Sequence, residues 1–211
     1  MATTATASSS NRPHRRWHWR VAALGGGLAF VLSTTITTAT ASQTTRPTNE
    51  NAVELGTALF SDLVTANAKV ASTLFFPESA YVEMKTGQLP NPAADYTNRL
   101  LDFYSLDEAA YHRYLTAGGQ PRLLRVLSDP SQAQWIAPGV CENNVGYWHQ
   151  PPIRLVYRQR GVVKSVAIDS LISWRGRFFV VHLGPNPRPV NVGTVDQPER
   201  GAGLPGPAGG C

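Results

Sequence analysis

The chain has 211 residues, of which 42% are apolar and 16% charged, enough for one domain with a hydrophobic core. Its formal charge of +5 comes from one end, because residues 1–41 hold four of the 19 basic residues and no acidic residue. The other 15 basic residues are matched by 14 acidic ones. Without an excess of positive charge there is little to attract a phosphate backbone, so we expect no nucleic-acid partner.

Residues 1–41 have the three parts of an export signal. The basic stretch Arg15–Arg20 precedes the apolar stretch Val21–Ile36, and Ala39–Ala41 matches a small-x-small cleavage site. The apolar stretch is short and interrupted by Ser and Thr, which favours a cleaved signal peptide over a membrane anchor. We therefore predict a secreted or cell-envelope protein, which touches the membrane only through this segment if it stays uncleaved.

Composition divides the remainder into three parts. Residues 42–49 are predicted to be a linker, and residues 50–184 a single domain. From Gly184 onward seven Gly and six Pro occur without periodicity, so too little apolar surface is available to offset the entropy of ordering. Residues 185–211 are therefore expected to form a disordered tail.

The chain has two cysteines, Cys141 and Cys211, and no CxxC pair. Outside the cytoplasm the two can form a disulfide, and a free or intermolecular thiol is the alternative. The histidines lack the spacing of a zinc site, and no glycine-rich phosphate loop is present outside the leader. We expect neither a metal nor a cofactor.

Two helical segments come first. Thr48 is a plausible N-cap for a helix whose apolar residues recur to Leu74, with Pro77 closing it. A loop-like stretch follows, and Ala93–Leu115 is predicted as a second helix or a broken pair, with Ser105 capping a restart. Gly118-Gly119 ends this region.

Strands follow the helices. Arg160-Gly161 and Arg175-Gly176 are expected to be tight hairpin turns between the three best of them. Helices first and antiparallel strands afterwards indicate an α+β fold. The predicted strands are Leu123–Leu127, Ala133–Ala137, Val145–His149, Ile153–Arg158, Val162–Ser173 and Phe178–Leu183.

This element order resembles the cystatin-like and NTF2-like cone folds, in which a curved antiparallel sheet wraps a long helix. The strings CENNVGYWH, from Cys141 to His149, and ISWRGRFFVVHLG, from Ile172 to Gly184, also resemble segments of uncharacterised secreted proteins from actinobacteria. The second resemblance implies no known activity. The first implies a fold that hosts both enzymes and binding modules, so it does not choose between them.

With two-residue turns, Ile153 pairs with Ile168, and Asp169 lies opposite His182. One sheet face is then apolar and packs on the helices. The other face brings Arg154, Asp169 and His182 together among Val156, Leu171, Phe178 and Val180. An Asp–His pair is the minimal general base, and Arg154 can hold an anionic group. The simpler interpretation is a solvated face on which opposite charges pair for little energy.

The strand Tyr147-Trp148-His149 is a second candidate region, because its aromatic side chains can line a pocket or an interface. Tyr147 and Trp148 are therefore candidate ligand contacts beside Arg154. Packing in the core or at a sheet edge is the alternative, since aromatic residues are mostly buried for their area.

No nucleophile or metal motif accompanies these residues. The leading hypothesis is accordingly an exported binding or interaction module of the cell envelope, without catalytic activity, whose partner is a protein or a small molecule. The alternative is a small enzyme or ligand carrier with a pocket on the sheet face that uses Arg154, Asp169 and His182. A pocket that contains all three residues would favour the alternative.

Overall fold

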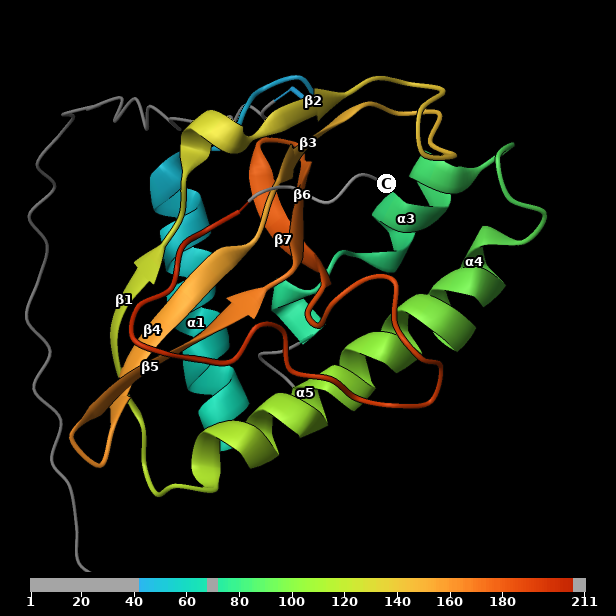
Figure 1. Cartoon of the computed structure of the whole chain (residues 1–211). Coiled ribbons are helices and arrows are strands. Elements are labelled where there is room, and N and C mark those ends of the chain that lie inside the picture. Colours follow the sequence, from blue (N-terminus) through green and yellow to red (C-terminus); the bar gives the residue numbers. More distant parts are fainter. Residues whose placement is uncertain (1–41, 68–71, 207–211) are drawn as a thin grey trace, which may run out of the picture. The chain divides into compact units, whose positions relative to one another are not determined.

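The computed structural model describes residues 42–67 and 72–206 (Figure 1). The predicted signal segment and Cys211 lie outside these residues. Within them, helices precede two antiparallel sheets, so the predicted α+β class is confirmed. The helical part comprises α1 (Asn49–Thr65), α3 (Glu78–Lys85), α4 (Pro92–Asp95), the π-helical segment η1 (Tyr96–Leu101) and α5 (Asp102–Thr116).

Helix α1 begins as predicted, because the Thr48 hydroxyl accepts from the backbone N–H of Asn51 at 3.3 Å. It ends earlier than predicted, at Thr65, where Ala66 takes a left-handed conformation with φ of 52°. Pro77 starts a helix instead of closing one, since it is the N-cap of α3. The loop predicted after Pro77 is therefore wrong for Glu78–Lys85, which forms α3 with Ala80, Tyr81 and Met84 buried.

The second helical region is a continuous run from α4 through η1 to α5. Ser105 does not cap a restart. It lies inside α5, and its hydroxyl donates to the carbonyl of Leu101, four residues earlier, at 2.9 Å. The end of the run agrees with the prediction, because α5 stops at Thr116 and Gly119 has a positive φ of 88°.

The strands form two four-stranded sheets, with the orders β1-β4-β5-β8 and β2-β3-β6-β7 (Figure 1). A short 3₁₀ turn, Pro130–Gln132, precedes β2. The strands are β1 (Arg122–Leu127), β2 (Gln134–Ile136), β3 (Tyr147–Gln150), β4 (Ile153–Gln159), β5 (Val162–Ile168), β6 (Ser170–Trp174), β7 (Arg177–His182) and β8 (Glu199–Arg200).

Both predicted hairpin turns are present. Arg160-Gly161 and Arg175-Gly176 each have two consecutive positive φ angles, the requirement of a two-residue turn whose twist matches the strands. Ile153 pairs with Ile168 as predicted. The same register continues into the second sheet, where His149 pairs with Ile172.

The two sheets therefore share one long hairpin that is interrupted in the middle. The interruption falls at Pro151 and Pro152 on one strand, and the register places Pro152 opposite Asp169 on the other. Proline has no N–H to donate to a ladder, so pairing fails here and the predicted strand Val162–Ser173 divides into β5 and β6. The backbone N–H of Asp169 is directed to the carbonyl of Leu183 at 3.4 Å.

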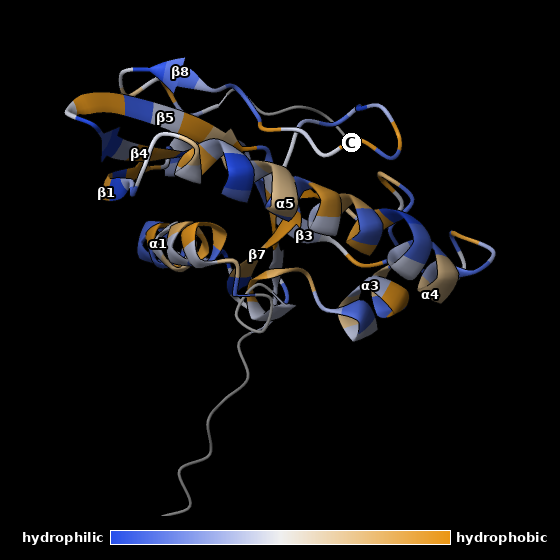
Figure 2. Ribbon diagram, turned by 90° about the horizontal axis from the view of Figure 1, so that it is seen from below, coloured by the Kyte–Doolittle hydropathy of each residue, from blue (hydrophilic) through white to orange (hydrophobic). Residues whose placement is uncertain are grey.

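Helix α1 covers one face of the β1-β4-β5 strands (Figure 2). The residues of β4 and β5 on that face are fully buried, as predicted for the apolar face. They are Ile153, Leu155, Tyr157, Val166 and Ile168.

The opposite face is covered by the C-terminal segment. Arg154 on this face is fully buried, and its guanidinium donates to Ser165 Oγ at 2.7 Å and to the carbonyl of Gln197 at 2.9 Å. A Cβ built on Gly203 would come within 2.3 Å of the Arg154 side chain, so only glycine permits this approach. Arg154 therefore belongs to the packing of the segment against the sheet.

The prediction of a disordered tail is thus wrong for residues 185–206. The composition of this segment offers little apolar surface, but polar contacts with the rest of the domain hold it in place. The Asp107 carboxylate accepts from the backbone N–H of Gly184 at 2.9 Å and of Thr194 at 2.8 Å, and it pairs with Arg188. The Asp107 and Arg188 side chains are each only 2% exposed, and removing one partner of such a pair is strongly destabilising.

The predicted linker, residues 42–49, also has defined contacts. The Gln43 side chain donates to the carbonyls of Gly146 at 3.0 Å and Ser173 at 3.3 Å, and it accepts from the N–H of Arg175 at 2.8 Å. This one amide satisfies three backbone groups, one just before β3 and two at the end of β6, so the segment is docked on the sheet and is not a free linker.

The Tyr111 hydroxyl joins the helices, both sheets and the tail. It is fully buried in α5 and lies within donating distance of the carbonyls of Ala167, at 2.6 Å, and Leu183, at 3.0 Å. It also accepts from the backbone N–H of Asp196 at 2.9 Å. One hydroxyl therefore satisfies three backbone groups, one near the end of β5, one directly after β7 and one in the C-terminal segment.

Removing this hydroxyl should be costly. We expect Tyr111→Phe to lower the free energy of unfolding by about 2–3 kcal/mol, because buried backbone groups lose their partner while the ring volume is kept. Urea unfolding followed by circular dichroism measures this. The control is Tyr114→Phe in the same helix, where the side chain is 38% exposed and we expect a change below about 0.5 kcal/mol. Equal effects of the two variants would contradict the assigned role.

Candidate functional site

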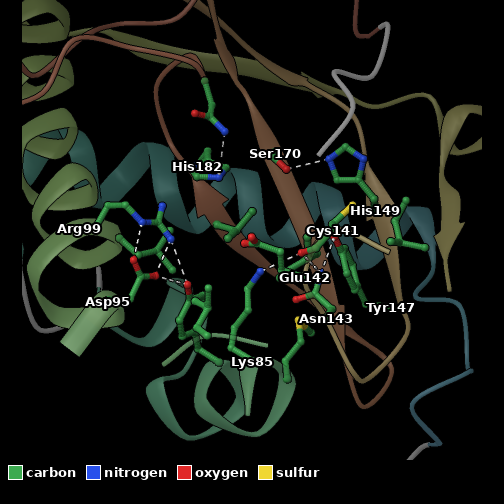
Figure 3. A pocket seen from close by; sticks show the side chains of 18 of the residues that line it. Lys85, Asp95, Arg99, Cys141, Glu142, Asn143, Tyr147, His149, Ser170 and His182 are labelled. Carbon is green, nitrogen blue, oxygen red and sulfur yellow. Dashed lines mark hydrogen bonds and ion pairs between the residues drawn. The ribbon is translucent and has the colours of Figure 1, made fainter. Parts of the chain in front are cut away.

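A cavity of about 570 Å³ lies between α3, η1, the loop before β3 and the β2-β3-β6-β7 sheet (Figure 3). Its volume is within the usual range of small-molecule sites. Apolar and polar side chains both line it. Those from the helices are Tyr81, Met84, Lys85, Asp95, Arg99 and Leu100. Those from loops are Leu89, Cys141, Glu142, Asn143 and Asn186. Those from the strands and the break between β5 and β6 are Gln134, Ile136, Tyr147, His149, Asp169, Ser170, Ile172, Val181 and His182.

A β-bulge decides which side chains of β7 enter the cavity wall. The pairing of β6 with β7 runs from Trp174 to Leu171 in the predicted register and then skips Val181, so Ser170 and not Asp169 lies opposite His182. Directly paired residues share a face, so the bulge places His182 with Ser170 and Ile172 on the cavity side. The predicted pairing of Asp169 with His182 is therefore wrong by one position.

Asp169 nevertheless lines the same cavity as His182, because it lies in the interruption between β5 and β6. Its carboxyl group has no hydrogen-bond partner among the described residues. Burial, reinforced by the nearby carboxylates of Asp196 and Asp107, raises the pKa of Asp169 to about 7. A half-buried carboxyl group that changes charge near neutral pH therefore faces the cavity.

The two histidines of the cavity wall are neutral at pH 7. Burial, together with the positive charge of Arg99, lowers the pKa of His182 to about 4, and burial lowers the pKa of His149. His182 Nε2 lies 3.5 Å from the Asn186 amide nitrogen. His149 Nε2 lies 2.7 Å from Ser170 Oγ, so this pair can exchange donor and acceptor roles as the tautomer requires.

Lys85 supplies positive charge from the last turn of α3. Its Nζ donates to the carbonyl of Cys141 at 2.9 Å and lies 5.9 Å from the centre of the Tyr81 ring. Burial lowers the pKa of Lys85, and the carboxylate of Glu142 opposes this shift. In Figure 3 the Lys85 side chain extends toward the loop that carries Cys141 and Glu142.

That loop is fastened to α3 and has an uncommon backbone. Cys141 and Glu142 both have positive φ, 58° and 54°. The N–H of Asn144 donates to the carbonyl of Met84 at 2.9 Å, and the Asn143 side-chain amide donates to the Cys141 carbonyl, also at 2.9 Å. The Cys141 carbonyl is thus held between two donors, which fixes the position of the Lys85 ammonium group.

Arg99 is a second cation of the wall, but it is already paired with a carboxylate. Its guanidinium makes two hydrogen bonds to the Asp95 carboxylate, at 2.7 and 2.6 Å, and a third to the Tyr81 hydroxyl at 3.0 Å. Tyr81 in turn donates to Asp95. The pKa of Asp95 is lowered chiefly by the bonds from Arg99. This triad joins η1 to α3 and stiffens one side of the cavity.

The predicted site residues are therefore only partly brought together. Asp169, His182 and Tyr147 line the cavity. Arg154 does not, because its guanidinium is occupied by Ser165, Gln197 and Glu199. The cavity therefore holds two residues of the predicted trio and not the third.

Trp148 points away from the cavity. Its indole N–H donates to the carbonyl of Thr44 at 3.0 Å, and the Arg46 guanidinium lies 5.1 Å from its ring centre. It packs against the N-terminal segment and against Trp135, as the core-or-edge alternative expected for this aromatic strand.

Several lining residues were missed by sequence reasoning. Lys85, Arg99 and Asp95 come from a helix that was not predicted and from the helical run after it. Their charge pattern carries no motif. The proximity of Ser170 and His149 could have been predicted, because the predicted hairpin register, continued past Pro152, brings them near each other.

The Cys141 sulfur takes part in a disulfide. Its predicted partner, Cys211, lies outside the described residues, so the pairing stays a prediction.

No family model, curated protein or solved structure matches this chain. Among residues 42–67 and 72–206, no helix has the length and apolar character needed to cross a membrane. Within the same ranges, no three His, Cys, Asp or Glu side chains are grouped so as to hold a metal ion. The cavity and its side chains therefore carry the functional argument.

Ionisation of Asp169 should make stability depend on pH. Because its folded pKa is about 7 and its unfolded pKa about 4, the contribution of Asp169 to stability falls as the pH rises from about 4 to about 7 and levels off above. Asp169→Asn removes this loss. We expect the variant to gain on the order of 2 kcal/mol over the wild type between these limits, after allowance for partial solvent exposure.

Urea unfolding across this pH range tests the prediction. The control is Asp102→Asn, at an exposed position at the start of α5, which should leave the pH dependence unchanged. Parallel stability curves for wild type and Asp169→Asn would show that Asp169 ionises normally in the folded protein.

Proposed function

We propose that the chain is an exported protein that binds a small molecule in the cavity between α3, η1 and the β2-β3-β6-β7 sheet. The observation that supports this most directly is a cavity of about 570 Å³ into which polar groups from helices, a loop and strands converge. A few polar groups placed in a partly apolar cavity are typical of ligand sites. The proposal narrows the binding or interaction role expected from the sequence to one location.

A second candidate is a small enzyme that uses the same cavity. It is favoured by Asp169, whose pKa of about 7 suits a general acid or base. It would have to use Asp169 with His149 and Ser170, because no hydrogen bond joins Asp169 to His182 in the described part of the chain. Binding needs no such catalytic arrangement and is therefore the better interpretation.

We also propose that the fold is a cone of the cystatin-like or NTF2-like kind. Two features favour this assignment. The β3–β6 and β4–β5 pairs form one bent hairpin, and α1 contacts β1, β4 and β7, which belong to both sheets. A long helix held against a bent sheet is the arrangement that defines such cones, and the cavity lies at the bend.

The binding proposal is tested by filling the cavity. Val181 lines it and is partly buried, so Val181→Trp should block the space and reduce ligand binding at least about tenfold. The measurement is native mass spectrometry of the protein isolated from the cells that make it, which detects a retained small molecule. Val162→Trp, at a strand position 37% exposed and away from the cavity, is the control.

We expect the wild type and Val162→Trp to carry the same additional mass, and Val181→Trp to lack it. If the wild type and both variants retain the molecule equally, the cavity is not the binding site. If the wild type retains no molecule, the proposal of a tight small-molecule ligand fails.

Export rests on residues 1–41 and is proposed on their charge and apolar pattern alone. The intact mass of the protein recovered outside the cytoplasm should correspond to a chain that begins at Ser42. A full-length chain in the membrane fraction would show an uncleaved anchor. A full-length chain in the cytosol would contradict export and, with it, the oxidising compartment expected for the cysteines.

A further inference from the structure

Lys85 is the first of two lining groups whose interactions are incomplete. Its ammonium group has three donors, and one of them is used by the Cys141 carbonyl. Among the described residues no carboxylate lies within 4 Å of its Nζ in an ion pair. Arg99, by contrast, is matched by Asp95. Lys85 is therefore a cation of the cavity wall with donors left for an anionic group.

Asp169 is the second, and it lies on a different wall. It follows β5, whereas Lys85 ends α3. Its carboxyl oxygens accept no hydrogen bond from the described residues, although three polar side chains of the same wall, His149, Ser170 and His182, lie nearby in the strands. A group with hydroxyl donors fits this wall, because a hydroxyl donates to a carboxylate and also accepts from a serine or a neutral imidazole.

We infer that the ligand is a small organic acid that also carries several hydroxyl groups, with its anionic group at Lys85 and its hydroxyl groups at Asp169 and the His149–Ser170 pair. This inference deepens the proposed function and rests on it. A purely apolar ligand leaves both groups desolvated without partners, which costs more than the apolar contacts return. A neutral polyol satisfies the Asp169 wall only and leaves the Lys85 charge unmatched.

Three probes of similar ring size separate the requirement for an anionic group from the requirement for hydroxyl groups. D-Glucuronate carries a carboxylate and hydroxyl groups, D-glucose has the hydroxyl groups without the charge, and cyclohexanecarboxylate has the charge without the hydroxyl groups. Binding to the dialysed exported protein is followed by chemical-shift changes of the lining residues. We expect glucuronate to bind at least about tenfold more tightly than either of the others.

Two variants test which residue binds the anionic group of the ligand and which binds its hydroxyl groups. Lys85→Met should weaken glucuronate at least about tenfold and leave glucose unchanged. Asp169→Asn keeps a hydrogen-bonding side chain and should instead weaken glucuronate and glucose by the same factor, with cyclohexanecarboxylate unchanged. The control is Lys164→Met on β5, whose ammonium group donates to Gln159 away from the cavity.

The outcomes separate this inference from the proposed function. If cyclohexanecarboxylate or glucose binds in the cavity as tightly as glucuronate, the cavity is a ligand site but the ligand class is wrong. If glucuronate binds and Lys85→Met has no effect, the assignment of the anionic end is wrong. If none of the probes shifts the lining residues and the native protein carries no retained molecule, both the inference and the proposed function fail.

Discussion

The constraint on which the structure depends is the absence of two N–H groups, at Pro151 and Pro152, in the middle of its longest hairpin. Without these donors the ladder cannot continue, and the hairpin passes from one sheet into the other. Asp169, opposite Pro152, is released from regular pairing and lies in the cavity wall. Two prolines therefore position both the bend of the fold and the carboxyl group of the candidate site.

The C-terminal segment connects this bend to the electrostatics of the cavity. Asp196 in the segment and Asp107, which anchors the segment to α5, are the two carboxylates that reinforce the raised pKa of Asp169. The Tyr111 hydroxyl holds the segment and the ends of β5 and β7 in place. Detaching the segment would hydrate Asp169 and remove a neighbouring charge, so a segment that is mostly outside the cavity lining determines how its carboxyl group titrates.

The sequence predicted those features of the fold that depend on residues close to one another in the chain. Thr48 starts the first helix, and the Arg-Gly turns with alternating apolar residues set the register of both hairpins. The bulge at Val181 was not predictable, because it inserts one residue into an otherwise regular alternation. The order of residues 185–206 was not predictable either, since it depends on buried polar partners such as Asp107 and Arg188, and Gly/Pro-rich composition carries no sign of them.

The division of charge in the cavity wall explains why Lys85 is available to a ligand. Arg99 and Lys85 both face the cavity, yet Asp95 is bound by Arg99 through two hydrogen bonds and is further committed to Tyr81. Because Arg99 and Tyr81 both bind Asp95, this carboxylate makes no ion pair with Lys85. The Nζ of Lys85 donates to the Cys141 carbonyl, which is itself fixed by Asn143, and the nearby Glu142 carboxylate favours its charged form without an ion pair. A cation arranged in this way loses little freedom when it meets an anion, and such preorganisation favours binding.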